Sequence, residues 1–440
     1  MWSIPRTLRF LFLASTLMVA GCLRPPSQEK ELVYSFWGSL EQQKADRKII
    51  EEFERENPGI KVKMLPIGQR YMEKVQAMLL GAVAPDIMMV DISYYDRWME
   101  RGVLMEITDA VDEIAREDAL MSLPRRTFER NGSFYGAPLN VHGLVMCVNR
   151  DALKAAGLPF KEDGWTWEEV REMAPALSRR RGNSEAITDY ALLMPSAEVL
   201  FAAYGAQLFD SPDKPTRATA QTPEGLAAFT FYRDLFLSGY AVPPDVKDDQ
   251  GTYQLFRDGR IAFFFCGRWL MPEIAGRVNF DWDIVPVPAG PTDPINPTRS
   301  STLHGGTGLA IWKDTPHPEE AKRFLKYYAG RRGAAVAMRS GRYVPVYERL
   351  AYSPEFKALR PGPEALTRLS DTMKEGAASI FLYRPGYTDV RRLFLRRAEQ
   401  MIYRNAAPER VLKGLQRDLD RWLERQADSA AHAQPPLSPE

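Results

Sequence analysis

Histidine and cysteine are scarce in this sequence, with four and three residues among 440. We find no His-Glu-x-x-His motif, no Walker A run and no Gly-x-Ser-x-Gly nucleophile elbow, and the histidines lack metal-ligand spacing. We therefore predict no cofactor, no metal and no catalysis. Paired carboxylates for glycoside hydrolysis stay open as an alternative, because their pairing is spatial and leaves no fixed sequence pattern.

An excess of charge is also missing. Lys and Arg number 58 against 57 Asp and Glu, and losing Arg6 and Arg9 with residues 1–21 would turn the net charge from +1 to −1. A nearly neutral chain has no electrostatic footprint for nucleic acid, so we exclude that partner. Beyond residue 21, no segment is apolar enough to span a bilayer.

The N-terminus has the pattern of an export signal. Arg6 and Arg9 precede an apolar run, Phe10 to Ala20, that is too short for a permanent membrane helix. The run closes with Val19-Ala20-Gly21-Cys22, which resembles the lipobox of bacterial lipoproteins. We predict a signal peptide over 1–21, lipidation at Cys22, a flexible tether over 22–31 and a location in the cell envelope. An ordinary secretory signal and a single anchoring helix are the alternatives.

Hydrophobic periodicity predicts an α/β fold. Short apolar runs at 32–36, 60–64 and 87–90 alternate with helical patterns at 41–56 and 71–80, which gives βαβ units and a parallel sheet. Later strands are expected at 134–138, 144–148, 261–266, 283–288 and 309–312. Helices are expected to begin at Thr166, Thr222 and Pro318, followed by helical residues 389–426 and a disordered tail over 427–440.

The order of short motifs along the chain resembles the extracellular solute-binding proteins of carbohydrate ABC importers, the group that includes maltose-binding protein. Each motif is weak alone, but the series covers nearly all of the mature chain. It runs through Phe36-Trp37-Gly38, Asn57-Pro58-Gly59, Ala84-Pro85-Asp86-Ile87, Tyr135-Gly136-Ala137-Pro138, Val148-Asn149-Arg150-Asp151, Trp165-Thr166-Trp167-Glu168-Glu169, Phe256-Arg257-Asp258-Gly259, Gly267-Arg268-Trp269 and Gly305-Gly306-Thr307-Gly308. Cys147 and Arg150 depart from the usual residues of the family.

The resemblance implies a two-lobed periplasmic-binding-protein-like fold with a hinge, of the maltose-binding-protein type. Lobe 1 would hold residues 32–141 and 289–341, and lobe 2 residues 142–288 and 342–426. Chain crossings are expected near Leu139 to Leu144, Val285 to Pro288 and Arg342 to Pro345. The family also implies a monomer that closes on a sugar and delivers it to the permease subunits of an ABC transporter.

Candidate ligand-binding residues lie at strand ends and at the expected crossings. Aromatic faces suit the C–H patches of a sugar, planar polar groups suit hydroxyl pairs, and glycines let the main chain approach a ligand. The set is Trp37, Glu41, Tyr71, Asp91, Asn140, His142, Trp269, His304, Gly305, Gly306 and Arg342, with Tyr383 and Tyr387 as further aromatic candidates.

Each candidate also has a structural reading. Asp91 is equally suited to cap a helix, Trp37 and Tyr71 to lie in a core, and the Gly305-Gly306 run to form a tight turn between a loop and a strand. For Cys147 and Cys266, buried free thiols are favoured over a disulfide. Arg70, Arg268 and Arg342 keep a glycerol phosphate ligand open, because a phosphate needs several inward cations.

Overall fold

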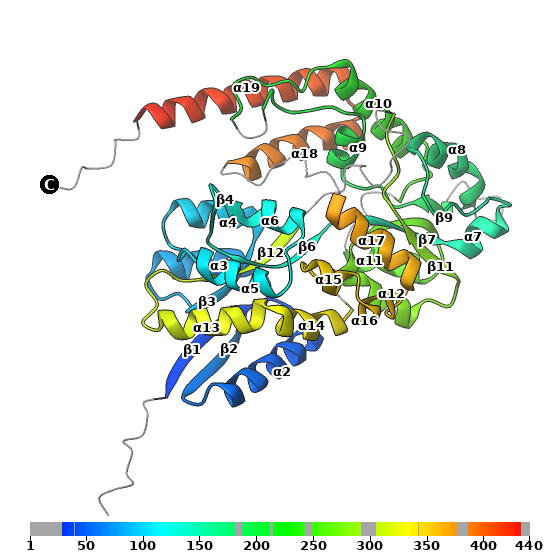
Figure 1. The fold of residues 1–440 in the computed structure, drawn as a ribbon. Coiled ribbons are helices and arrows are strands. Elements are labelled where there is room, and N and C mark those ends of the chain that lie inside the picture. The colour runs from blue at the N-terminus through cyan, green and yellow to red at the C-terminus, as the bar shows by residue number, and fades with distance from the viewer. Residues whose placement is uncertain are drawn as a thin grey trace, which may run out of the picture.

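Two five-stranded sheets organise the chain in a computed structural model (Figure 1). It describes residues 29–432 apart from 39, 181–186, 212–213, 243–248, 292–304, 342 and 376–385. We call the part built on the first sheet lobe 1 and the part built on the second sheet lobe 2. Cys22, His304, Arg342 and Tyr383 therefore lie outside the described residues, as do the side chains of Glu41 and His142.

The sheet of lobe 1 is mixed, with the order β2-β1-β3-β12-β6. Strands β1, β2 and β3 are parallel, as the βαβ pattern predicts, and β12 is antiparallel to both β3 and β6. The strands are β1 (Lys30–Phe36), β2 (Ile60–Pro66), β3 (Ile87–Asp91), β6 (Ala137–His142) and β12 (Gly305–Ile311). The carboxyl ends of β1, β3 and β6 thus share one edge, where β12 begins.

Helices cover both faces of this sheet, and a short hairpin lies beside it. The helices are α2 (Leu40–Glu56), α3 (Tyr71–Leu80), α4 (Ile92–Glu100), α5 (Thr108–Glu117), α6 (Ser122–Phe128), α13 (Pro318–Ala329) and α14 (Arg331–Arg339). The hairpin joins β4 (Glu129–Arg130) to β5 (Ser133–Phe134). The predicted bounds of α3 and the predicted start of α13 are confirmed.

The sheet of lobe 2 has the order β11-β7-β10-β9-β8. Its strands are β7 (Val145–Asn149), β8 (Arg179–Arg180), β9 (Ile187–Leu192), β10 (Ile261–Cys266) and β11 (Trp282–Val285). Around it lie α7 (Arg150–Ala155), α8 (Trp167–Leu177), α9 (Ala197–Ala203), α10 (Pro223–Leu237), α11 (Asp249–Arg257), the 3-10 helix η3 (Arg268–Leu270), α12 (Met271–Arg277), α18 (Tyr387–Tyr403) and α19 (Pro408–His432).

Local sequence signals explain where two of these helices begin. Thr166 and Glu169 form the predicted capping box at α8, each side chain accepting from the backbone N–H of the other. Thr222 caps α10, and Pro223 occupies its first turn. The tail prediction is wrong over residues 427–432, because α19 continues to His432. Three alanines in that stretch favour helix continuation.

Alternate residues of the second sheet belong to two different hydrophobic cores. Cys147 and Phe264 face the core that continues into lobe 1, whereas Val148 and Phe263 face a core made by α8, α9, α10, α18 and α19. The period-two geometry of a strand produces this division. Three short helices, α15 (Glu348–Ala351), α16 (Pro354–Lys357) and α17 (Pro363–Glu375), complete the shared core.

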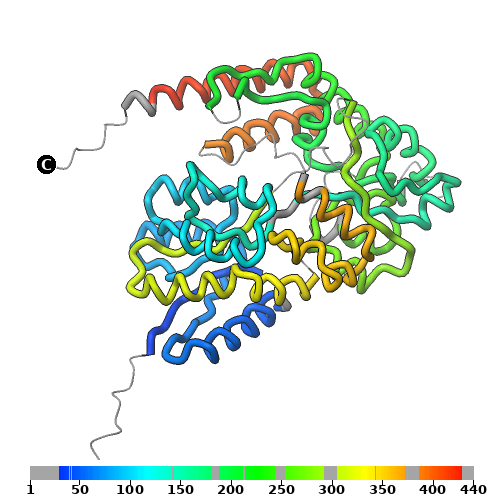
Figure 2. Tube along the Cα trace, viewed as in Figure 1, coloured from blue at the N-terminus to red at the C-terminus, as the bar shows by residue number. Residues whose placement is uncertain are grey.

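These helices lie between the lobes (Figure 2). Helix α17 packs on α6 of lobe 1 and on β11 of lobe 2. The approach to α15 still hydrogen-bonds to lobe 1, since Met121 N–H donates to the Val346 carbonyl and Glu348 N–H to the Ala119 carbonyl. The chain thus leaves lobe 1 later than the expected crossing near Arg342 to Pro345.

A disulfide joins Cys147 of β7 to Cys266 of β10, so the preference for free thiols is wrong. Cys147 is paired in register with Phe264, which places Cys266 diagonally opposite on the same face. The Cα atoms are 6.6 Å apart, within the range that a disulfide spans. The two residues are 119 positions apart in sequence, so their spacing could not reveal the pairing. Among the described residues, no helix is long and apolar enough to cross a membrane.

Candidate functional site

The carboxyl edges of the two sheets meet at the first chain crossing. His142 ends β6 at the edge of sheet 1, and Val145 begins β7 opposite Cys266, at the carboxyl end of β10. Three peptide units of 3.8 Å each keep the Cα atoms of His142 and Val145 within about 11 Å. Residues that follow β1, β3 and β10 are therefore gathered around one junction, where open α/β sheets bind their ligands.

One row of polar side chains lies across the edge of sheet 1. Thr307 of β12 is in register with both Asp91 of β3 and Asn140 of β6. Adjacent strands are about 4.8 Å apart, so the three residues are close neighbours. Asn140 and Thr307 are buried, and Asp91 is half-buried. Sequence reasoning named Asp91 and Asn140 but missed Thr307, which stands inside the glycine run it had singled out.

Asp91 caps α4. Its Oδ1 accepts from the backbone N–H of Ser93 at 2.9 Å and from the Ser93 hydroxyl. The capping interpretation of Asp91 is therefore confirmed, and the cap also fixes the carboxylate at the edge of the sheet. A ligand role for Asp91 stays a prediction.

Trp37 follows β1 and packs against Tyr71 at the start of α3. The ring centroids are 4.8 Å apart, with 54° between the ring planes. The Tyr71 hydroxyl lies within hydrogen-bond distance of the Ser35 hydroxyl, and it donates to the main-chain carbonyls of Ser35 and Met89. Burial raises the pKa of Tyr71 well above its usual value. Tyr71 thus supports the half-buried Trp37, and its own hydroxyl is engaged by β1 and β3.

The Gly305-Gly306 run is strand, so the alternative interpretation of a tight turn is wrong, and a ligand role for these glycines stays a prediction. Gly305 pairs with His142, and Gly306 pairs with Val141 in the backbone register of β12 and β6. A Cβ atom on Gly306 would lie 3.2 Å from the Phe128 ring, and one on Gly308 would lie 2.6 Å from it. The glycines at 306 and 308 therefore let α6 pack closely on β12.

Trp269 is the candidate ligand-binding residue that lobe 2 contributes near the junction. It lies in η3, three residues beyond Cys266, and is half-buried. A Cβ atom on Gly267 would fall 1.7 Å from the Trp269 ring, so the indole rests on the Gly267 backbone. The neighbouring Arg268 is buried, and its Nη1 donates to the Arg360 carbonyl at 2.8 Å.

A cavity of about 720 Å³ lies between lobe 1 and the arm formed by α18 and α19. Figure 1 shows this arm extending from lobe 2 over α4 and β4. Helix α18 contacts the start of α4 here, since the Thr388 hydroxyl donates to the Ser93 carbonyl at 3.4 Å. Of the sequence-predicted candidates whose side chains the structure describes, Tyr387 alone lines the cavity. Its lining combines aromatic, acidic and amide side chains, among them Asp96, Glu100, Arg130, Asn131, Tyr387 and Trp422.

Electrostatics in this cavity are nearly balanced. Arg130 pairs with Asp96 at 2.7 Å and lies over the Tyr95 ring. Burial, together with the nearby Asp96, raises the pKa of the Glu100 carboxyl. No group of three or more potential metal ligands occurs in the described ranges. Sequence reasoning missed Trp422, because its position in the sequence is equally typical of a residue on the buried face of an amphipathic helix.

The chain is similar in sequence to known proteins. A model of the family described as bacterial extracellular solute-binding protein matches residues 37–335. The arabinooligosaccharide-binding protein of Halalkalibacterium halodurans is 26% identical over 289 residues, which cover 63% of this chain and 61% of that protein. The match thus spans less than two thirds of that relative.

Solved structures agree in fold. An ABC substrate-binding protein from Listeria monocytogenes in complex with cycloalternan superposes with a TM-score of 0.76 at 22% identity, over 90% of this chain and 99% of that one. UgpB from Mycobacterium tuberculosis in complex with glycerophosphocholine gives 0.75 at 24% identity, over 89% and 98%. The predicted two-lobed periplasmic-binding-protein fold is confirmed. With a family model matching most of its length, this chain belongs to the bacterial extracellular solute-binding proteins, a family that binds its solutes without catalysis.

Proposed function

We propose that this protein captures a sugar or oligosaccharide between its lobes and delivers it to the permease of an ABC transporter. The observation that carries the proposal is the composition of the junction of the two sheet edges, with Trp37, Trp269, Asn140, Thr307 and Asp91. It combines aromatic surfaces with amide, hydroxyl and carboxylate groups. Such groups suit a neutral ligand with many hydroxyls, which both donate and accept hydrogen bonds.

The volume supports a ligand larger than a single small solute. Pockets for ligands of drug size commonly measure about 300–1,000 Å³, and the cavity of about 720 Å³ lies in the upper half of that range. Its lining comes from α4, the β4–β5 turn, residues 215–216 and the α18–α19 arm.

A phosphate ligand is the second candidate, because a solved relative holds glycerophosphocholine. The arginines that would favour it are engaged elsewhere. Arg70 pairs with Glu73 and is largely exposed, Arg268 donates to a main-chain carbonyl, and Arg130 pairs with Asp96. An anion beside Asp96 would also meet like charge. The described part of the site thus favours a neutral sugar.

Hinge closure is the proposed mechanism. Ligand would bind first to one lobe and contact both lobes only in the closed form, so its binding shifts the population toward closure. Hinge rotation is usually concentrated in a few residues that connect two lobes, and we place it at the crossing formed by residues 143–144. The closed protein would then dock on the permease.

Lipid anchoring at Cys22 belongs to the same proposal. The disulfide supports an exported protein, because such bonds persist in oxidising compartments. Growing cells with radiolabelled palmitate should label the full chain, and Cys22→Ala should abolish the label. Equal labelling of both chains would refute anchoring at this residue.

A thermal-shift screen tests the ligand. The panel contains mono- and oligosaccharides, glycerol 3-phosphate and glycerophosphocholine. A true ligand at 100 to 1,000 times its dissociation constant should add about 3–4 kcal/mol of stability. A shift only with the phosphate compounds would replace the sugar proposal with the second candidate.

Two tryptophan variants in lobe 2 locate the site. Trp269→Ala should abolish the sugar-induced shift and leave the unliganded melt nearly unchanged. The matched control is Trp282→Ala, because Trp282 begins β11 at the opposite edge of the same sheet. It should keep the shift. A large loss of unliganded stability in Trp269→Ala would instead assign that indole to the core.

A further inference from the structure

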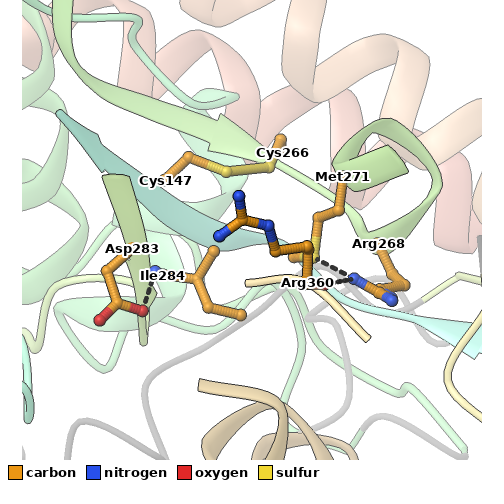
Figure 3. The surroundings of a disulfide bond; sticks show 7 residues. All are labelled: Cys147, Cys266, Arg268, Met271, Asp283, Ile284 and Arg360. Carbon is orange, nitrogen blue, oxygen red and sulfur yellow. Dashed lines mark hydrogen bonds between the residues drawn. A yellow bond between two sulfur atoms is a disulfide. The ribbon is translucent and has the colours of Figure 1, made fainter. Parts of the chain in front are cut away.

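The segment that carries Trp269 is fixed on its N-terminal side by a covalent bond. Cys266 is the last residue of β10, and its disulfide to Cys147 ties this strand end to β7 (Figure 3). Cys266 also pairs in register with Val145, the first residue after the chain crossing. The disulfide therefore lies directly beside the junction of the two sheet edges.

Arg268 fixes the same segment from a different element. Its Nη1 donates to the Arg360 carbonyl at 2.8 Å and lies 3.1 Å from the Met271 sulfur, as Figure 3 shows. The guanidinium also lies over the Phe356 ring of α16, with its carbon 5.7 Å from the centroid. The side chain thereby connects η3 to the turn between α16 and α17.

Burying Arg268 in this way is unfavourable for the free energy of folding. It is 4% exposed, and within the described ranges it forms no ion pair and its Nε has no hydrogen-bond partner. Burial lowers its pKa to about 10. Burying a charge without a paired counterion opposes folding. A contribution to stability is therefore a poor explanation of this arginine, and a contribution to the position of its neighbours is a better one.

Trp269 stands between these two attachments. Its indole rests on Gly267, where any side chain would collide with the ring. Movement of the Gly267 peptide would therefore move the indole with it. The disulfide restrains the residue before Gly267, and the arginine restrains the residue after it.

We propose that the Cys147–Cys266 disulfide and Arg268 are positioning residues that hold Trp269 in place as the ligand platform of lobe 2. The inference rests on the proposed function for the role of Trp269, but the rigidity of the segment can be measured without a ligand. Losing either attachment loosens residues 267–270 and weakens sugar binding through Trp269 alone.

Amide hydrogen exchange of the unliganded protein is the first test. The double variant Cys147→Ala/Cys266→Ala and the single variant Arg268→Met should each raise exchange at residues 267–270 by about tenfold. The matched control is Val148→Ala, which weakens the opposite face of the same sheet. Unchanged exchange in the two attachment variants, or an equal rise in the control at a comparable loss of melting temperature, would overturn the proposal.

Sugar affinity in two backgrounds is the second test. The probe is the sugar that gives the largest shift in the thermal screen. Each attachment variant should weaken its binding about tenfold when Trp269 is present. It should not change the residual affinity of Trp269→Ala, which is measured by titration at sugar concentrations above those of the thermal screen. Equal losses in both backgrounds would refute positioning through the indole. If no sugar binds, the proposed function fails, and the exchange experiment still decides whether the segment is held as described.

Discussion

Replacing Asp46 with asparagine should make the stability of this protein less dependent on pH. Asp46 of α2 is fully buried in lobe 1. Its Oδ1 accepts from the Gln42 amide at 2.6 Å and from the Tyr328 hydroxyl at 2.7 Å, and its Oδ2 has no hydrogen-bond partner among the described residues. Burial outweighs these two hydrogen bonds and raises the pKa of Asp46 from 3.8 to about 6.

The direction follows from proton binding. Between pH 3.8 and 6, the native state holds the Asp46 proton more tightly than the unfolded state does, so unfolding releases a proton. Stability therefore falls as the pH rises through this window. A shift of about two pKa units corresponds to about 3 kcal/mol in full, and about 2 kcal/mol of it falls between pH 4.5 and 7.5.

Urea unfolding of the wild-type protein and of Asp46→Asn at both pH values measures the effect. An asparagine amide in the site has a cost of its own, but that cost does not change with pH. The stability difference between the two proteins should therefore move by about 2 kcal/mol in favour of Asp46→Asn as the pH rises. Glu51→Gln, on the exposed face of the same helix, is the control. A difference that stays constant within experimental error would show that Asp46 is ionised as easily in the folded chain as in the unfolded one.

Three further substitutions probe packing, capping and the ion pair of a buried carboxylate. Gly308→Ala should destabilise lobe 1 by about 1–3 kcal/mol in chemical denaturation, because the new methyl group meets the Phe128 ring at 2.6 Å; a neutral result would contradict the tight packing of α6. Asp91→Ala should lose about 1 kcal/mol with the α4 cap, and Asp91→Ser should recover most of it; equal losses would count against the cap. Arg391→Ala should cost about 3 kcal/mol at neutral pH, because it leaves the buried Glu198 carboxylate without its three hydrogen bonds; a loss below 1 kcal/mol would mean that water or another group replaces the arginine.

Local signals in the sequence predicted the elements well. The capping pair Thr166 and Glu169, the proline at 223 and the apolar run Ile261 to Cys266 each act over a few residues, and each predicted the start of a helix or the bounds of a strand. The edge residue Asp91 was found because a buried strand ends there. These predictions depend on backbone geometry that neighbouring residues determine.

Such local signals could not predict features that depend on the register between strands that are distant in sequence. The glycines at 305 and 306 have the composition of a turn, but they pair with β6 as strand residues, and the Phe128 ring packs closely against Gly306. The disulfide needed the register of β7 against β10, and the row that adds Thr307 to the site needed the registers of β12 with two strands. Trp422 reaches the cavity only because α19 extends over lobe 1.

The division of one sheet between two cores has a consequence for how the molecule melts. Neighbouring residues of β7 and β10 face opposite cores. Unfolding of either core therefore removes the packing from one face of the same two strands. Helices α15–α17 extend one of those cores into the other lobe. Heating should therefore give a single cooperative transition, with probes in both lobes reporting the same midpoint. Because α17 contacts both α6 of lobe 1 and β11 of lobe 2, a molecule that bends at residues 143–144 can still denature as one body.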